Sequence, residues 1–402
     1  MSAPSTDAPA APPSHATIAL LAAAAFFSGG ALRICDGLLP RLARDFGMTP
    51  GAAGRVMITF SIAYGAMQLV FGPLGDRFGK ARLVLFALVG CAAMSAASAL
   101  SPSFDVLLLA RVGWGMAAAG VIPLAMAWIG DAVPYEQRQA TLARLLLGTL
   151  SGMMAGQLAG GLFGDSGLGW RGAFFTMAAG YAFIAALLFV RLRRAGAGGP
   201  AAAHARFATQ VKAVLGSRWS HVVLGSALVE GIFLLGPMAY LPSMLHGRFG
   251  LAISAASGLV ALYAVGGLVY AITAKTIVRR WGERRMVAIG GWIMGLGYLA
   301  WWALPVVWTA GPVALLVGFG TYLYHNTLQT NATQMAPTAR GTGVALFASC
   351  FFVGQAIGVT LAGWAFDHAG AAALLLPPAV ALPLAGLAFA RALRKRDQQP
   401  AN

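Results

Sequence analysis

Charged side chains are scarce in this sequence, and their scarcity excludes an ordinary soluble fold. Asp, Glu, Lys and Arg make up 10% of its 402 residues, and 58% of the residues are hydrophobic. A soluble domain usually carries about 25% charged residues. The apolar residues recur in runs of roughly 18 to 25, long enough to cross a ~30 Å hydrocarbon core as helices. The chain is therefore predicted to lie in a membrane.

Cysteines and catalytic motifs are also few. The three cysteines, Cys35, Cys91 and Cys350, lie inside apolar runs. An odd number of cysteines without metal-ligand spacing predicts neither a disulfide framework nor a metal site. The sequence also lacks a nucleophile motif and the glycine loop that binds nucleotide phosphates. We therefore expect no catalytic residues, no cofactor and no step driven by ATP.

The apolar runs predict an all-α membrane protein with twelve transmembrane helices. An open strand in lipid would leave backbone polar groups unpaired, so each run is expected to be helical. A cytoplasmic linker over 192–218 divides the helices into six-helix bundles at 16–191 and 219–392, between a disordered tail at 1–15 and a tail at 393–402. The predicted spans are 16–39, 51–71, 83–100, 104–129, 140–162, 170–190, 222–245, 253–277, 286–304, 306–328, 343–366 and 371–392.

The net charge of +16 does not indicate nucleic-acid binding, because the basic residues alternate from loop to loop. They gather around 77–82, 191–218, 279–285 and 391–396, whereas the intervening loops hold few. By the positive-inside rule the basic side is cytoplasmic. Both termini are therefore expected in the cytosol, with the chain in a bacterial inner membrane.

An internal repeat appears when the sequence is shifted against itself by 203 residues. The matching positions are Phe46-Gly47 with Phe249-Gly250, Gly79 with Gly282, Pro134 with Pro337, and Leu158-Ala159-Gly160 with Leu361-Ala362-Gly363. Each match falls at the same point of its half. The repeat predicts two similar halves related by an axis along the membrane normal.

The loop predicted after the second helix carries the most specific signal. It reads Gly72-Pro73-Leu74-Gly75-Asp76-Arg77-Phe78-Gly79-Lys80-Ala81-Arg82. This segment resembles motif A of the major facilitator superfamily, and the helix count, linker and repeat extend the resemblance over nearly the whole chain. The copy in the second half, at 279–285, lacks the aspartate.

The resemblance implies a latch on the cytoplasmic side. Gly72 and Gly79 would allow a tight turn, and Asp76, Lys80 and Asp131 would form a charge relay that holds this side closed. Lys80 stands where the family more often has arginine. The basic residues Arg77 and Arg82 flank the relay, and Arg138 fits the short loop between helices four and five. The alternative is a solvated loop whose basic residues only set the topology.

A ladder of glycines at every fourth position marks the fifth predicted helix. Its members are Gly148, Gly152, Gly156, Gly160 and Gly164. The ladder resembles motif C, the antiporter signature, but Gln157 stands where that motif has proline. A small-residue face that only lets helices pack closely is the alternative.

Ionisable groups at membrane depth are candidates for proton coupling. Arg33, Asp36 and Arg111 fall at one level of the bilayer, and Arg111 with Gly115 resembles motif B of proton-coupled members. These three side chains are expected to form one buried cluster, with a purely structural ion pair as the alternative. Glu230 has no basic neighbour in its own helix, and burial without a partner favours the neutral form of a carboxyl. Glu230 is therefore the first candidate for proton coupling and Asp36 the second.

Polar and aromatic side chains of the second half are the candidates for substrate binding. They are Tyr240, Tyr263, Tyr322, His325 and Asn326. His325 is expected to be a hydrogen-bonded packing residue rather than a proton relay. One sequence does not identify the substrate.

The leading functional interpretation is efflux of small, amphipathic organic molecules by alternating access, in exchange for protons. Proton-coupled or facilitated uptake of a metabolite uses the same fold and remains an alternative. A membrane sensor that transports nothing is a different class, and the absence of an appended soluble domain argues against it. The expected partners are the lipid bilayer, a small-molecule substrate and protons, and the resemblance favours a monomer.

The alternating basic loops predict how the chain is oriented. Cysteines introduced near Ala201 and in the C-terminal tail should react with a membrane-impermeant maleimide only after the cells are opened. A cysteine at Gly167 should react from outside intact cells. A C-terminal tail that is labelled from outside would contradict the twelve-helix topology.

Overall fold

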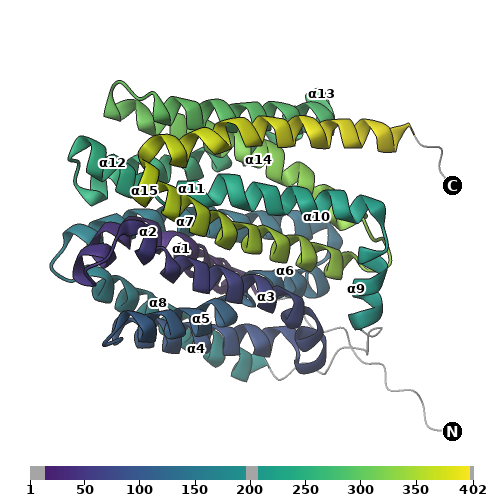
Figure 1. Ribbon diagram of the computed structural model, residues 1–402. Helices are drawn as coiled ribbons and strands as arrows, with labels where there is room; N and C mark the ends of the chain where they lie inside the picture. The colour runs from purple at the N-terminus through teal and green to yellow at the C-terminus, as the bar shows by residue number, and fades with distance from the viewer. Residues whose placement is uncertain (1–13, 196–206, 399–402) are drawn as a thin grey trace, which may run out of the picture.

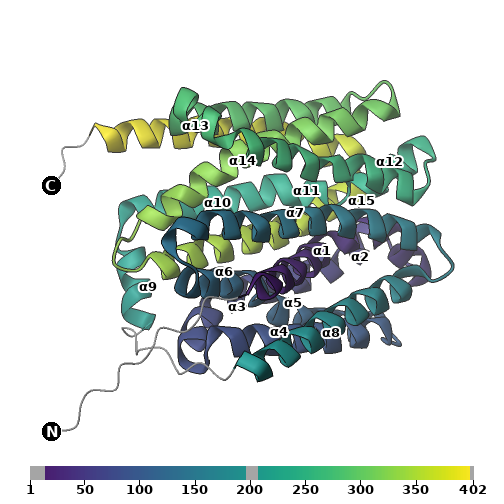
Figure 2. The ribbon, with the colours of Figure 1, turned by 180° about the vertical axis from the view of Figure 1, so that it is seen from behind.

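The computed structural model describes residues 14–195 and 207–398, and these residues form helices joined by short turns, without a strand. Figures 1 and 2 show the helices of the first half gathered on one side of the molecule and those of the second half on the other. The predicted N-terminal tail over 1–13, the linker over 196–206 and the last four residues lie outside the described part. The all-α prediction is confirmed.

Residues 14–195, the described part of the first half, contain eight helices. They are α1 (His15–Asp45), α2 (Pro50–Ala53), α3 (Arg55–Phe78), α4 (Lys80–Ala99), α5 (Phe104–Ala118), α6 (Val121–Ala132), α7 (Tyr135–Asp165) and α8 (Gly169–Ala195). The fourth predicted span is interrupted between α5 and α6, and the fifth extends beyond its predicted ends at both sides.

The second half begins with α9 (Phe207–Leu215), a short helix inside the predicted linker. The elements that follow are α10 (Arg218–Glu230), a π-helical turn η1 (Gly231–Leu235), α11 (Gly236–Met238), α12 (Leu241–Phe249), α13 (Ile253–Trp302), a 3-10 turn η2 (Val307–Thr309), α14 (Ala310–Gln334) and α15 (Arg340–Asp397). The seventh predicted span is therefore built from four short elements rather than one continuous helix.

Ten helical stretches of the described chain are long and apolar enough to cross a membrane. Two of them, α13 with 50 residues and α15 with 58, are too long for one crossing. Each contains a glycine with non-helical dihedral angles, Gly282 (φ 69°) in α13 and Gly370 (φ 74°) in α15. Divided at these glycines, the ten stretches contain twelve helical segments.

The internal repeat is present in the backbone as well as in the sequence. The described residues with positive φ are all glycines: Gly47, Gly79, Gly169, Gly250, Gly282 and Gly370. Gly47 and Gly250 both have φ 62°, and they are separated by the repeat offset, as are Gly79 (φ 88°) and Gly282 (φ 69°). Only glycine adopts such angles without strain, so each half turns its chain at equivalent points.

The loops divide between two faces of the bundle. We call the face with the loops at Gly47 and Gly250 the Gly47 face, and the opposite face, with the turns at Gly79 and Gly282, the Gly79 face. Helix α9 and the C-terminal end of α15 lie on the Gly79 face in the two views. An even number of crossings in the second half requires the end of α15 to return to the face of α9.

The segment resembling motif A is mostly helix, which corrects the predicted loop. Helix α3 continues through Pro73 to Phe78, Gly79 alone makes the turn, and α4 begins at Lys80. The fall in hydropathy after Phe71 does not mark the end of the helix. Helix α3 therefore continues beyond the apolar run that predicted it.

The glycine ladder of α7 forms a close seam with α1. A methyl group added at Gly148, Gly152, Gly156 or Gly160 would collide with backbone carbonyl oxygens of α1, and these belong to Ala22, Phe26, Gly30 and Ile34. The partners also recur every four residues, so the two backbones run side by side in contact. Their close approach is the geometry that small-residue faces permit in membranes.

The seam predicts a specific cost for the smallest possible substitution. Gly152→Ala places a methyl group against the carbonyl of Phe26 and should cost about 1–3 kcal/mol of stability, because two helices must move apart. A lower midpoint of thermal unfolding in detergent would show this loss.

Gly225→Ala is the matched control. Gly225 lies in α10, and a methyl group there meets nothing within 4 Å. Since alanine is the better helix former by about 1 kcal/mol, this control should be neutral or stabilising. Equal effects at the two positions would show that the α1–α7 contact is not tight.

Candidate functional site

A buried ion pair joins two helices of the second half. Glu230, the last residue of α10, has a side chain that is 0% exposed. His325 of α14 places its Nδ1 atom 3.1 Å from Oε1 and 3.0 Å from Oε2 of this carboxylate. The prediction that Glu230 is isolated is therefore wrong. Its partner comes from another helix, which inspection of its own helix cannot reveal.

The chain around Glu230 is irregular. The π-helical turn η1 follows it directly and shifts the side chains of the next turn relative to a continuous α-helix. Such turns occur frequently at functional sites. A methyl group on Gly231 would meet the carbonyl oxygen of Phe351, so η1 packs directly on the backbone of α15.

Aromatic rings cover His325 on its other side. The centroid of its imidazole lies 5.4 Å from that of Phe347 and 5.0 Å from that of Phe351, both on α15. The pair thus sits where α10, α14 and α15 converge. Tyr263, Tyr322 and Tyr324 lie within electrostatic reach of Glu230, and the carboxylate itself is fully buried, where an uncompensated charge is costly.

The Glu230–His325 contact joins two titratable side chains from different helices. An ionised Glu230 is stabilised at this depth by a protonated His325 facing it. A proton added to the carboxylate, or removed from the imidazole, abolishes the attraction between the charges.

A second buried ion pair lies in the first half. Within α1, the Nη1 atom of Arg33 lies 3.0 Å from Oδ2 of Asp36, and both side chains are almost fully buried. Arg33 also reaches the second half: its Nη2 atom donates to the sulfur of Met238 at 2.7 Å, and its guanidinium lies 5.8 Å from the ring centroid of Tyr263. Arg33 therefore connects the two halves.

Arg111 lies beside this pair in an aromatic cage. Its Nε atom donates to the carbonyl of Val56 at 3.1 Å, and its guanidinium lies 4.2 Å and 4.8 Å from the ring centroids of Phe60 and Trp114. Asp36 is within electrostatic reach of both arginines. The structure thus brings the three predicted residues together, with the close contact between Asp36 and Arg33.

The residues predicted to bind substrate do not form a single cluster. Tyr263 lines a small cavity between the halves together with Arg33 and Gln157. Tyr322 and Asn326 lie beside Tyr270, whose ring stacks on that of Tyr322 at 6.3 Å between centroids. Tyr240 lies apart from them: its hydroxyl donates to the carbonyl of Val359 at 3.0 Å, close to Gly51 of the other half.

Part of the predicted latch is visible at the Gly79 face. Lys80 forms an ion pair with Asp131, and Arg138 donates to the carbonyl of Val133 at 3.3 Å. The guanidinium of Arg77 lies 5.2 Å from the ring centroid of Phe78. The side chain of Asp76 lies outside the described part, so its place in the relay stays a prediction.

The second half contains a polar cluster at the position that corresponds to the Lys80–Asp131 ion pair, and the sequence analysis did not predict it. Asn331 donates to Glu283 at 3.0 Å and accepts from Arg396 at 2.6 Å, and it is 0% exposed. Glu283 falls on Lys80 at the repeat offset, so the same position carries the opposite charge in each half. The repeat offset could therefore have identified Glu283 as a candidate from the sequence.

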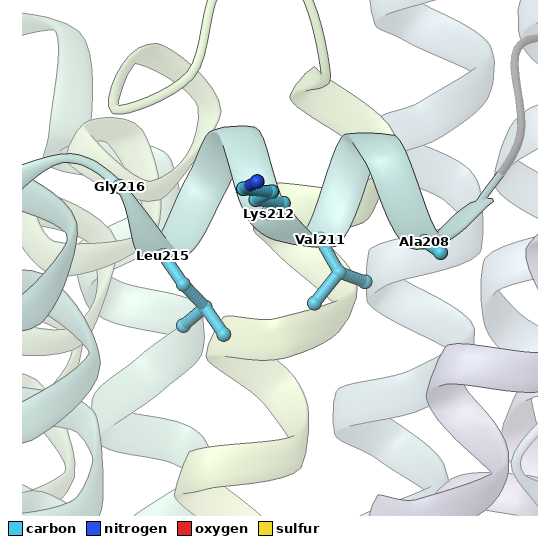
Figure 3. Close-up of a pocket in the computed structure, with 5 residues that line it drawn as sticks. All are labelled: Ala208, Val211, Lys212, Leu215 and Gly216. Carbon is cyan, nitrogen blue, oxygen red and sulfur yellow. The ribbon is translucent and has the colours of Figure 1, made fainter.

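A pocket of about 600 Å³ lies along α9 at the Gly79 face. Figure 3 shows its lining: Val211 and Leu215 project from one side of the helix, near Ala208, Lys212 and Gly216. It contains none of the buried ionisable residues. This pocket is therefore a groove beside a surface helix rather than part of the buried site.

Comparison with known proteins accounts for this architecture. The sequence model of the Major Facilitator Superfamily matches residues 21–359 and 260–402. The chain is 27% identical to a chloramphenicol resistance protein of Streptomyces lividans over 87% of its own length and 88% of that relative. It is also 27% identical to the uncharacterized MFS-type transporter YybF of Bacillus subtilis, over 42% of this chain and 43% of that relative.

The fold is shared with solved transporters. The crystal structure of the POT family transporter PepTSo superimposes with a TM-score of 0.78, at 15% sequence identity, over 97% of this chain and all of that one. The family match spans both halves, and the relatives are transporters rather than enzymes. The chain is therefore a multi-pass membrane transporter that belongs to the major facilitator superfamily.

Proposed function

We propose that this transporter exports small, amphipathic organic molecules by alternating access in exchange for protons, and that the Glu230–His325 pair carries the proton. The observation behind the proposal is a fully buried carboxylate whose hydrogen-bond partner is an imidazole on another helix. Exchange of one proton changes both the net charge of the pair and its strength. A proton-coupled transporter needs such a link between binding of a proton and the contact between two helices.

The pair suits antiport because substrate and proton can compete for one site. If substrate binding near His325 favours the form of the pair with one proton fewer, then binding a proton must favour substrate release by the same factor. The rings of Phe347 and Phe351 supply apolar surface beside the charge, which suits a molecule with both apolar and polar parts.

Efflux is favoured over uptake by two observations. A relative aligned over 87% of this chain is a chloramphenicol resistance protein, and resistance of this kind is consistent with export. The α7 ladder resembles the antiporter signature, and its glycines lie in a tight helix seam. Uptake through the same fold is the competing outcome of the transport assay.

The transport assay uses proteoliposomes with an imposed pH gradient and chloramphenicol as the probe. Glu230→Gln mimics the protonated carboxyl, so it should abolish accumulation driven by the gradient. It should retain exchange between equal concentrations, because exchange needs no net proton movement. His325→Gln keeps a hydrogen-bonding side chain without a titratable charge and should also lose driven transport.

Asp36→Asn is the matched control, because Asp36 is the other buried carboxylate with a basic partner. Driven transport that survives in Glu230→Gln and disappears in Asp36→Asn would place the proton site at the Arg33–Asp36 pair. Driven transport in both variants would exclude coupling through either acid. Accumulation in the direction of proton flow would establish uptake instead of efflux.

A further inference from the structure

Two carboxylates at the Gly47 face each reach from one half to a helix start in the other. The first is Asp165, the last residue of α7. Its Oδ1 atom accepts the backbone N–H of Ile253 at 3.0 Å, and its Oδ2 atom accepts that of Ser254 at 2.8 Å. These are the first two residues of α13. Asp165 therefore binds the start of a second-half helix.

The second carboxylate makes the reverse connection. Asp367 of α15 accepts the backbone N–H of Gly51 through Oδ1 at 3.0 Å and the hydroxyl of Thr49 through Oδ2 at 2.5 Å. Thr49 caps α2, which leads directly into α3. Asp367 therefore binds the start of a first-half helix.

The two contacts are copies of each other under the internal repeat. Pro50 and Gly51 fall on Ile253 and Ser254 at the offset of 203, and Asp165 and Asp367 correspond to within one residue. Proline has no N–H to donate at the position of Ile253. The hydroxyl of Thr49 supplies the second hydrogen bond in its place. One contact could be incidental, but the same contact built twice with the halves exchanged is a feature of the fold.

The chemistry favours a carboxylate at each helix start. The first N–H groups of a helix have no partner within it, and the helix dipole attracts negative charge there. The residue before α13 is Ala252, which has no side chain able to cap the helix. Asp165 supplies this cap from the other half of the protein.

The contacts lie at the two seams where the halves meet. Helix α7 packs on α13, and α3 packs on α15. Near Asp165, a methyl group on Gly161 would collide with Ser257, and near Asp367 one on Gly51 would collide with the backbone of Gly363. Both seams are therefore closed at this face.

We propose that Asp165 and Asp367 are paired latches that hold the Gly47 face closed, and that both must release before the halves separate there. The proposal rests on the alternating access described above but not on the identity of the proton site. Asp165 is exposed and Asp367 is half-buried. Each carboxylate can therefore be hydrated once it leaves its helix, which makes the latch reversible.

Distances between spin labels test the latch directly. One label pair, Gly167→Cys with Trp308→Cys, spans the halves at the Gly47 face, and a second, Gln139→Cys with Arg280→Cys, spans them at the Gly79 face. Both pairs are placed in a chain whose three native cysteines are replaced by serine. The distributions are measured by double electron–electron resonance for Asp165→Ala, Asp367→Ala and the double variant.

Each alanine variant should raise the population with a separated Gly47 face about tenfold, because two hydrogen bonds to a charged group are lost. The double variant should raise it about a hundredfold, because both latches act on one opening. The Gly79 pair should move closer in the same samples. The Asp→Asn variants keep one acceptor and should show smaller shifts.

Asp105→Ala is the matched control, because Asp105 is an exposed acid in the first turn of α5 at the same face. It should leave both distributions unchanged. A Gly47 distribution that stays as in the unsubstituted chain in the double variant would overturn the latch. Broader distance distributions at both faces, together with a lower unfolding temperature, would also overturn it. That result would mean that the carboxylates only stabilise the helix starts.

The distances measured in the latch variants should not depend on proton coupling. Glu230→Gln combined with the double latch variant should still show the separated Gly47 face. If Glu230→Gln loses driven transport but the double latch variant keeps its distances unchanged, the latch is refuted and the proton site is not. If Glu230→Gln keeps driven transport but the double latch variant shows the separated Gly47 face, only the proton site is refuted.

Discussion

A charge buried in a membrane bundle needs a partner, and in this protein Glu230 and Arg33 each contact a residue of another helix. Glu230 meets His325 across α10 and α14, and Arg33 meets Asp36 while touching Met238 of the other half. The desolvation of each charge is offset only while its partner stays in place. A movement that separates such a pair would therefore leave an unpaired charge in apolar surroundings.

The backbone seams set where such movement can occur. The α1–α7 seam lies within the first half and is closed along its length by glycines at every fourth residue. The seams between the halves are tight near the Gly47 face, where Asp165 and Asp367 cap helix starts. A close seam inside a half, with polar contacts between the halves, fits the proposal that the halves rock about a central pathway.

Features that depend on local sequence were predictable, and features that depend on contacts between distant helices were not. Helix length and hydropathy are local, so the all-α fold and the turn at Gly79 followed from the pattern. The partner of Glu230 lies 95 residues away on α14, and no local rule connects the two. Asp165 and Asp367 resemble solvated residues at helix ends, and only the fold shows that each faces a helix of the other half. The helical form of 72–78 was missed because hydropathy reports where the membrane ends, not where a helix ends.

The central claim is that Glu230 binds and releases the coupling proton, and infrared difference spectroscopy between alkaline and acid pH tests it most directly. Among the carboxyl C=O stretching bands that appear on acidification of the purified protein, one should belong to Glu230. This band should be absent from Glu230→Gln and present in Asp36→Asn. A spectrum of Glu230→Gln that keeps every band, or loss of the same band in Asp36→Asn, would contradict the account.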